Sequence, residues 1–549
     1  MYECPNCGGN LWYDIPSGKI ACRSCDSKFD PYEVSESNGA EEATDYEVTV
    51  FTCPQCGGEI YSTDNTAAGF CTFCGSSAIL ESRLQREHRP GYIIPFQKTK
   101  DECKESYIKM MRRVVFAPKE LKSKKHISEF RGIYMPYWVY YIRQGGDNVS
   151  LQGATSIRRG DYIVTSHYFL DMDLQAYYKG ISFDASSSFA DAISEKLAPF
   201  DVKNMKRFTP SFLSGFYADT SDVDTSLYEE DAKKLAISRT KDFLEKDKKV
   251  GKYKLEGTDT TIGQQLNTCV ESIDGAMFPV WFMAYKNKDR VAYATVNGQT
   301  GKVVADLPVD SKKYVAGSII LALPLFLLLN MFLTVTPGVL LSMVSVIAMI
   351  VALVYGSRMK KIAVKEGRED DKGAVAAERR RQWRKLRRAP GQRVEEVRDS
   401  TLAATAEPEK KDSFGRKFLK NNLVAATEMF IIFIMFCTAT ELLPYIGDKR
   451  IFITISLIVT AVSYFSSASR IKKIEAKKGI AGSFWILIST VIAAVIVYMN
   501  PVSDYFYYGC VIIVLLGIIA AFTDLLRCYN IYATRPLPQF HYQGGDNRA

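Results

Sequence analysis

The sequence predicts a multi-domain protein with two small β ribbons, each built around four cysteines, a cytosolic α+β domain, and an all-α, multi-pass membrane region of about six helices. Three observations support this fold class: a duplicated cysteine pattern near the N-terminus, a polar but aromatic-rich middle segment, and long uncharged apolar stretches after it. A chain of 549 residues is also too long for one hydrophobic core. We therefore expect several independently organised regions.

The N-terminal cysteines form two matching quartets. Both have the spacing C-x2-C-x14-C-x2-C, and the second repeats the first 49 residues later, which indicates an internal duplication. A gap of two residues lets both thiolates of a pair bind one ion, and two pairs complete a tetrahedral shell of four sulfurs. The eight candidate metal ligands are Cys4, Cys7, Cys22, Cys25, Cys53, Cys56, Cys71 and Cys74.

We interpret the quartets as tandem Cys4 zinc ribbons, ribbon 1 over residues 1–32 and ribbon 2 over residues 48–82, with one structural zinc ion in each. Neither segment can bury a sufficient core, so metal binding should supply most of its folding free energy, on the order of 10 kcal/mol. Cysteine fills every ligand position, which leaves no open site for a catalytic water. A rubredoxin-like iron centre and a CxxC redox pair are the alternatives.

Residues 83–312 predict a cytosolic α+β domain, in which mixed periodicity indicates both helices and strands. The third expected helix begins with a capping box formed by Ser226 and Glu229. Its buried face should carry Ala232, Leu235, Ala236 and Phe243. The helices are expected over residues 100–115, 189–197 and 226–248. The strands are expected over residues 134–142, 162–171, 175–183, 278–285, 290–296 and 302–305.

Two segments of this domain, 134–138 and 278–282, both contain Pro and Trp and resemble each other, which is consistent with a duplicated β-rich unit. We expect them to pack in the core beside edge-strand prolines. A peptide-binding groove is the alternative. The pairs Asn297-Gly298 and Thr300-Gly301 predict a hairpin turn between the last two strands.

Long apolar stretches predict six membrane spans. Residues 314–357 contain no charged side chain, and Pro337-Gly338 divides them, so we expect a transmembrane hairpin over residues 313–357. Four further transmembrane helices are expected within residues 421–526. Their apolar cores are residues 424–444, 451–469, 481–500 and 505–524.

Basic residues predict the orientation of these spans. The segment 358–420 holds 20 Lys and Arg against 11 Asp and Glu, so it is expected to be a basic cytoplasmic loop. Alternating spans then place both the N- and C-termini, including the tail 527–549, in the cytoplasm of a cell membrane protein. The densest basic stretch, residues 374–388, predicts a helix that binds anionic lipid. A solvated charged loop and a nucleic-acid tether are the alternatives.

Sequence motifs give no indication of catalysis. The chain has none of the motifs G-x-x-x-x-G-K-[ST], G-x-G-x-x-G, G-x-S-x-G and H-E-x-x-H, and its four histidines are scattered. We therefore expect a protein that is not an enzyme. Glu428, Glu441 and Asp524 lie near the ends of expected spans, where interface placement accounts for them. Ion or proton transport is the alternative role for these carboxylates.

The chain resembles bacterial membrane-anchored double zinc-ribbon proteins, which often carry transferred labels such as transcription-factor-type (TFIIB-type) zinc ribbon or primosomal helicase-like. The resemblance covers roughly residues 1–320. It implies a non-enzymatic membrane adaptor linked to envelope stress, with a membrane scaffold protein of the phage-shock type as a possible partner. The residues that carry the resemblance are both CPxCGG pairs and residues 94–96, 116–119, 134–138, 213–218, 278–282 and 297–302.

Charge argues against the nucleic-acid labels. Residues 1–82 contain three basic and thirteen acidic side chains, and each zinc with four thiolates adds about two negative charges. Such a surface repels phosphate, whereas nucleic-acid binding depends on Lys and Arg. We therefore predict an adaptor or docking platform on the cytoplasmic face that binds a cytosolic or membrane protein. The alternatives are a small transporter or channel regulated by a metal-binding head, and a membrane tether for nucleic acid.

Overall fold

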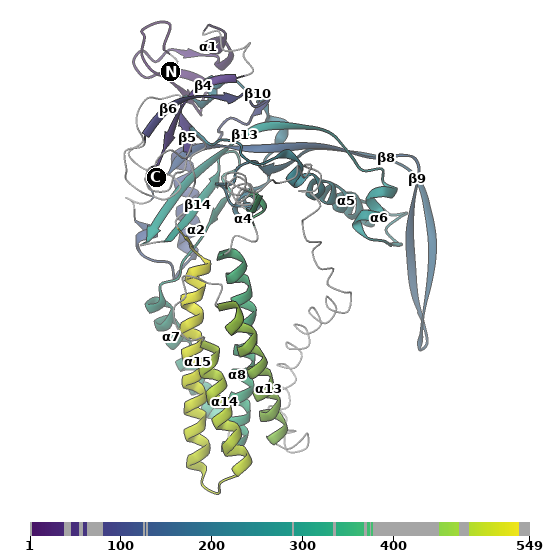
Figure 1. The fold of residues 1–549 in the computed structure, drawn as a ribbon, viewed down its shortest axis with the longest axis vertical. Coiled ribbons are helices and arrows are strands. Elements are labelled where there is room, and N and C mark those ends of the chain that lie inside the picture. Colours follow the sequence, from purple (N-terminus) through teal and green to yellow (C-terminus); the bar gives the residue numbers. More distant parts are fainter. Residues whose placement is uncertain are drawn as a thin grey trace, which may run out of the picture. The chain divides into compact units, whose positions relative to one another are not determined.

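The protein is organised as two compact units, in a computed structural model of the chain (Figure 1). The first unit consists of Met1–Pro308, Asp370–Glu378 and Thr534–Ala549, and the second of Val309–Glu369 and Arg379–Ala533. The expected division into an N-terminal cysteine cluster, a β-rich domain and C-terminal apolar helices is confirmed. The structure describes residues 3–37, 45–53, 59–62, 81–123, 127, 130–287, 290–332, 336–366, 371–373, 375–376, 449–471 and 482–536.

The first unit begins with a small three-stranded antiparallel sheet, as expected for a ribbon. It consists of β1 (Leu11–Asp14), β2 (Lys19–Cys22) and β3 (Lys28–Phe29), and α1 (Pro31–Ser37) follows it. Gly18 takes a positive φ of 64° in the β1–β2 turn, a conformation that suits glycine. Tyr13 and Ile20 are buried, which gives this sheet one apolar face.

This small sheet packs on a 3-10 turn of the central domain, η3 (Pro210–Leu213). The Phe212 ring lies 5.5 Å from that of Tyr13 and 5.8 Å from that of Tyr32. The Ser211 hydroxyl donates to the Pro31 carbonyl at 2.7 Å. Ribbon 1 therefore shares a hydrophobic core with the β-rich domain, and this core stabilises it in addition to any metal ion that its cysteines bind.

Three strands of the ribbon 2 region extend the large sheet of this unit. They are β4 (Asp45–Thr52), β5 (Glu59–Ser62) and β6 (Glu81–His88), and β4 pairs antiparallel with both of the others. β5 in turn pairs with β11 (Tyr217–Ala218). Of the second cysteine quartet, Cys53 is described and buried, whereas Cys56, Cys71 and Cys74 lie outside the described residues.

The central sheet is built around two long strands, β8 (Arg131–Arg159) and β13 (Cys269–Asn287). In β8, Met135, Tyr137 and Val139 face one core, while Tyr140 and Ile142 face another. This burial on both faces accounts for the continuous apolar run in the sequence. The remaining strands are β7 (Tyr92–Ile93), β9 (Tyr162–Asp184), β10 (Lys206–Arg207), β12 (Lys254–Leu255), β14 (Arg290–Asn297), β15 (Val303–Ala305) and β16 (Arg535–Pro536).

The two segments with Pro and Trp pair with each other. In the β8–β13 register Pro136 lies opposite Met277, and Pro279 opposite Tyr134. The Trp138 ring nitrogen donates to the Val223 carbonyl at 2.9 Å, and that of Trp281 to the Lys98 carbonyl at 2.9 Å. Both segments are packed in the core, as expected, but on inner strands of the sheet, so the expectation of edge strands was wrong.

The expected hairpin turn between β14 and β15 is confirmed. The Asn297 amide donates to the Lys302 carbonyl at 2.9 Å, and the Gly301 amide donates to the Asn297 carbonyl at 2.8 Å. Gly301 has a φ of 76°, which a side chain would strain. β14 also pairs with β16, a strand that follows the last helix of the second unit.

The expected helices of the central domain are present, but the expected capping box is not. The Asp224 carboxylate accepts the Ser226 amide at 2.9 Å and opens a 3-10 turn, so the α-helix begins only at Glu229. Of the expected buried face, Ala232 and Ala236 are buried. The helical elements are α2 (Lys100–Arg113), η1 (Glu120–Lys122), α4 (Asp191–Leu197), η2 (Val202–Asn204), η4 (Thr225–Tyr228), α5 (Glu229–Lys246) and α6 (Asp259–Gln265).

The two other residues expected on that face are exposed. Phe243 is 70% exposed and Leu235 39%, while Ile237 and Leu244 are buried instead, in a core shared with β8 and α6. The helix is therefore rotated relative to the expectation. Its contacts with the long strands, rather than its own pattern, set which face is buried.

Strands β8 and β9 form one long antiparallel hairpin where the sequence indicated three separate strands. Its far end extends past α5 and α6 (Figure 1). Gly145 allows the strands to stay paired, because a Cβ atom there would lie 1.8 Å from the Leu174 carbonyl oxygen. Gly160, with a φ of 63°, lies in the turn.

The second unit contains fewer candidate membrane spans than expected. Three helical segments among the described residues are long and apolar enough to cross a membrane: Pro337–Val364, Gly482–Met499 and Asp504–Tyr532. The sequence predicts six spans. One of them, residues 424–444, lies outside the described residues. The apolar part of α13, Phe452–Ala468, is shorter than the three candidate spans. The helices are α7 (Ser311–Phe332), α8 (Pro337–Glu366), α13 (Lys449–Ile471), α14 (Gly482–Met499) and α15 (Asp504–Tyr532).

Helices α8, α13, α14 and α15 pack together along small and hydroxyl-bearing side chains. The Ser463 hydroxyl on α13 donates to the Ala352 carbonyl on α8 at 2.6 Å. Thr460 and Thr490 bring their hydroxyls within 3.3 Å of each other. Small residues allow close approach of helices in a lipid environment, and their hydroxyls bond across the interface.

Candidate metal centre

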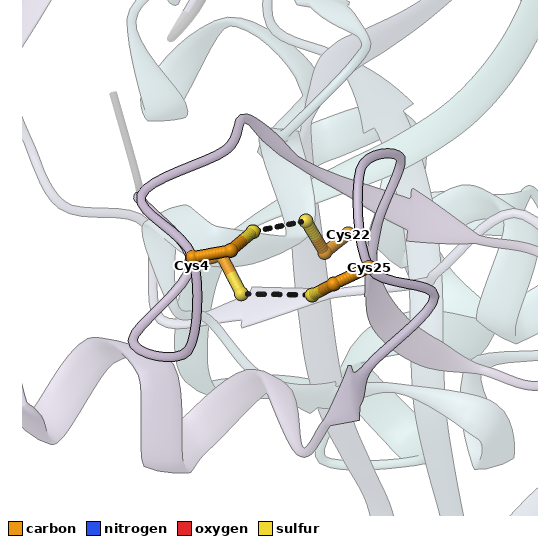
Figure 2. Close-up of side chains that lie close together, drawn as sticks. Cys4, Cys22 and Cys25 are labelled. Carbon is orange, nitrogen blue, oxygen red and sulfur yellow. Dashed lines mark hydrogen bonds between the residues drawn. The ribbon is translucent and has the colours of Figure 1, made fainter.

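Four thiols from two loops of ribbon 1 meet at one point. Cys4 and Cys7 precede β1, Cys22 ends β2, and Cys25 lies in the β2–β3 turn. Their sulfur atoms all lie within 4.8 Å of one another. The Cys4 and Cys25 sulfurs are 3.6 Å apart and those of Cys7 and Cys22 3.4 Å apart (Figure 2). This group can hold a metal ion, and it is the first of the two quartets that the spacing predicted.

The two loops share one backbone geometry. The Cys4 amide donates to the Gly9 carbonyl and the Gly8 amide to the Cys4 carbonyl, both at 2.8 Å. The second loop has the same pattern: the Cys22 amide donates to the Ser27 carbonyl at 2.9 Å, and the Asp26 amide donates to the Cys22 carbonyl at 3.1 Å. These turns also direct backbone amides at sulfurs, Gly9 at Cys7 and Ser24 at Cys22, the latter at 3.4 Å, which stabilises thiolates.

Each loop needs one residue at positive φ. Gly8 supplies it in the first loop, with a φ of 71°, and Asp26 in the second, with a φ of 55°. Asp is among the few residues that tolerate this region. Gly8 and Asp26 therefore fill the same role in the two loops.

Gly9 keeps the two loops close together. A Cβ atom at this position would lie 2.7 Å from the Ser24 hydroxyl oxygen and 3.2 Å from the Cys22 sulfur. The second glycine of the CPxCGG motif therefore sets the distance between the cysteine pairs.

The thiols compete for protons when no cation is bound. Hydrogen bonding to Ser27 lowers the pKa of Cys25 to about 6. The Gly9 amide lowers the pKa of Cys7, but the Cys25 and Cys22 thiols outweigh it and raise that pKa to about 12. A bound cation removes this competition because it stabilises all four thiolates at once.

The donor set fits a closed tetrahedral S4 site. Thiolate sulfur is a soft ligand that selects zinc or iron over magnesium and calcium. Four protein ligands fill the tetrahedron, so a bound ion would be structural and not exposed to a substrate. The structure thus contains residues that fit the expected zinc.

Of the three carboxylates considered for transport, the structure describes the contacts of Asp524. Asp524 lies within α15, and its carboxylate accepts the Tyr355 hydroxyl at 2.6 Å and the Gly482 amide at 2.8 Å. It therefore caps the N-terminus of α14, a favourable place for a negative charge. Glu428 and Glu441 lie outside the described residues, as does the basic stretch 374–388 apart from residues 375–376.

A buried carboxylate cluster lies in the first unit, and sequence reasoning missed it. It consists of Asp184 at the end of β9, Asp191 at the start of α4, and Asp371, all nearly inaccessible to solvent. Asp191 accepts the Tyr228 hydroxyl and the Lys372 amide, each at 2.8 Å. Burial raises the pKa of Asp184 well above its usual range, and the charge of Asp191 adds to this. The three residues are far apart in the chain, so no local pattern indicates the cluster.

Comparison with known proteins yields one relative. The chain is 28% identical over 341 residues to YdjG, an uncharacterized protein of Bacillus subtilis (strain 168). The alignment covers 96% of that protein and 59% of this chain. No protein-family model and no solved structure matches the chain.

We expect the purified full-length protein to contain two zinc ions, because each quartet offers four thiolates to one ion. Changing Cys22→Ser should remove one ion per chain, since three thiolates bind zinc much more weakly. Elemental analysis by mass spectrometry measures both values. Cys103→Ser is the matched control, because Cys103 is a buried cysteine that is not part of the quartet, and it should keep both ions. Iron in place of zinc, or an unchanged content in Cys22→Ser, would contradict the assignment.

We expect stability to fall as pH rises, in part through Asp184. The folded protein keeps a proton on Asp184 that the unfolded chain releases near pH 4. The stabilisation that this proton gives is complete at low pH, and it is lost as the pH rises through the raised pKa of Asp184. Asp184→Asn keeps the shape and removes the titration. Thermal unfolding between pH 4.5 and pH 8, a window set by the ordinary carboxyl pKa of about 4, should show a flatter profile for this variant. Asp161→Asn, an exposed carboxylate, should match the unmodified protein; identical profiles for all three would disprove the role of Asp184.

Proposed function

We propose that this protein is a non-enzymatic, membrane-anchored zinc-ribbon adaptor that presents a docking platform on the cytoplasmic face of the cell membrane, in a pathway linked to envelope stress. The observation that carries this proposal is the closed four-cysteine site seated on a large β domain. A closed site stabilises a surface but offers no open position for chemistry. Such an arrangement is typical of structural metal modules that present a surface to a partner.

The loops of ribbon 1 are available to a partner. Residues 5–8 and 23–26 are exposed at their outer ends, while Cys4 and Cys22 anchor them from below. The acidic balance of residues 1–82 favours an electropositive partner protein over nucleic acid. A cytosolic protein or a membrane scaffold of the phage-shock type fits this chemistry, the latter on the strength of the family resemblance.

The membrane part acts as the anchor in this proposal. Three helices long and apolar enough to cross a membrane support membrane association. We propose a multi-pass arrangement with cytoplasmic termini, because Lys and Arg concentrate in the segment 358–420. The stretch 374–388 would add contacts with anionic lipid.

A small transporter or channel regulated by the metal-binding head is the second candidate. The contact between Asp524 and Tyr355 inside the helical bundle favours it, because carboxylates within membrane helices often lie on ion or proton paths. The role of Asp524 as a helix cap gives a structural reason for the same residue. We therefore rank transport below docking, and a membrane tether for nucleic acid third.

The proposed orientation predicts the location of fused reporters. A reporter inserted after residue 390 should be cytoplasmic, because this position lies in the basic segment, and one inserted after Gly447 should be external. Paired phosphatase and fluorescent-protein fusions measure the two locations, since each is active on one side of the membrane. The reverse pattern would overturn the orientation and, with it, the cytoplasmic docking platform.

The docking proposal predicts that capture of a partner depends on ribbon 1. Replacing both Cys22 and Cys25 with Ser should release the ion, unfold the exposed loops and abolish capture of a crosslinked partner from native membranes. The Cys103→Ser protein should retain capture. The amount of variant protein recovered in the membrane fraction should be unchanged, since the membrane helices satisfy their own backbone hydrogen bonds.

The same proteins separate docking from transport. Reconstituted vesicles containing the unmodified protein should show no ion or proton flux under the docking proposal. A flux that Asp524→Asn abolishes, together with capture that survives loss of Cys22 and Cys25, would reverse the ranking of the two candidates.

A further inference from the structure

The end of the β8–β9 hairpin stands free of the rest of the first unit. Every residue from 156 to 169 is exposed. The last buried position on β8 is Ala154, beside β12, and Leu151 before it packs in a core with α5 and α6. From Ala154 to the turn at Gly160 the strand reaches about 20 Å at roughly 3.3 Å per residue.

The base of this projection is fixed, while its tip is not covered. The His167 ring contacts the Glu256 carboxylate at 2.8 Å, and the Tyr168 and Tyr253 rings lie 5.1 Å apart. Beyond them, the Ser156 and Thr165 hydroxyls are 2.9 Å apart across the two strands. In the part of the chain that is described, the residues from 156 to 165 pair only with each other. We call residues 156–165 the hairpin tip.

The hairpin tip carries apolar side chains on both of its faces. Residues opposite each other in an antiparallel pair project to the same side. Ile157 lies opposite Val164 on one face, and Ile163 lies opposite Arg158 on the other. Ile157 is 60% exposed, Ile163 71% and Tyr162 78%. An isolated two-stranded ribbon is at best marginally stable in water, so such side chains indicate a surface that becomes covered.

The distribution of these side chains identifies what covers them. A protein that binds a ribbon covers one face or extends one edge, which would leave apolar residues on the other face in water. The interfacial layer of a bilayer surrounds both faces at once. Tyrosine and arginine are residue types found at this level of a membrane, and Arg158 and Arg159 match the charge of anionic headgroups.

The backbone limits how deep the tip can go. The outer edges of both strands carry amide and carbonyl groups that have no strand beside them in the described structure. Such groups cannot enter hydrocarbon without a large free-energy cost. The tip therefore fits the hydrated headgroup region and not a transmembrane position.

A bilayer is also within reach of this unit through the chain itself. β16 begins at Arg535, directly after α15 ends at Tyr532, and α7 begins at Ser311 shortly after β15 ends at Ala305. α15 is one of the helices long and apolar enough to cross a membrane. Short covalent links of this kind raise the effective concentration of the tip at a lipid surface.

We propose that the hairpin tip binds the headgroup region of an anionic lipid bilayer, with Ile157, Tyr162 and Ile163 inserted among the headgroups and Arg158 and Arg159 paired with their phosphates. This second, peripheral membrane contact is independent of the docking function proposed above. It fixes the β domain at the membrane surface in addition to the anchor that the helices provide.

Photo-crosslinking of the full-length protein tests this proposal. Benzoylphenylalanine replaces Tyr162 in one variant and, as a matched control, Phe243 in another, because Phe243 is an equally exposed aromatic residue of α5 in the same unit. Both proteins are assembled into lipid nanodiscs of phosphatidylcholine alone or mixed with phosphatidylglycerol. Mass spectrometry then identifies what each probe has bound.

We expect lipid adducts at position 162 to exceed those at position 243 several-fold in the anionic discs. They should fall several-fold in discs of phosphatidylcholine alone, and equally when Arg158 and Arg159 are both changed to Gln. Zinc content that stays unchanged in every variant verifies that the unit is folded. Adducts with a second copy of the chain, lipid adducts no greater than those at position 243, or equal yields in both kinds of disc would each overturn the proposal.

Discussion

The antiparallel pairing of β8 with β13 is the interaction on which the rest of the first unit depends. This pairing runs from Cys269 opposite Arg143 to Phe282 opposite Arg131, with one irregularity. Because both strands are inner strands, the helices, the hairpin and the ribbon region all attach to one or the other. Prolines at its centre are tolerated because their carbonyls still accept hydrogen bonds, Pro136 from Ala185 and Pro279 from Gly298. Because β8 is an inner strand of this sheet, it can carry the β8–β9 hairpin that projects from the sheet.

The features that sequence reasoning identified correctly are those with a local cause. Two residues separate Cys4 from Cys7 and Cys22 from Cys25, a spacing that lets one ion bind both thiolates of a pair, and the structure brings the four sulfurs together. The β14–β15 turn follows from Asn297 and Gly301 in the same way. What it could not identify depends on distant contacts. The orientation of α5 depends on β8, and the carboxylate cluster joins residues 184, 191 and 371.

Ribbon 1 also differs from an independent metal module in a way that affects its role. Because Phe212 packs against Tyr13 and Tyr32, displacement of the ion would loosen the exposed loops while the inner face stays attached. A bound metal would therefore control the shape of the outer loops more than the existence of the ribbon. A docking surface of this kind can be lost without unfolding the domain that carries it.

The pairing of β16 with β14 has a consequence for biosynthesis. Arg290 hydrogen-bonds to Thr534 through two of its nitrogens, and Val291 pairs with Arg535, so this edge of the sheet is completed by residues that are made after α15. The helices α7, α8, α13, α14 and α15 leave the ribosome before that strand does. Domains generally fold as their chain emerges, but this one cannot complete its sheet until α15 has been synthesised. Completion of this sheet thus reports that synthesis has passed α15, and a chain that stops before β16 would expose the Arg290–Val291 end of β14 to chaperones and proteases.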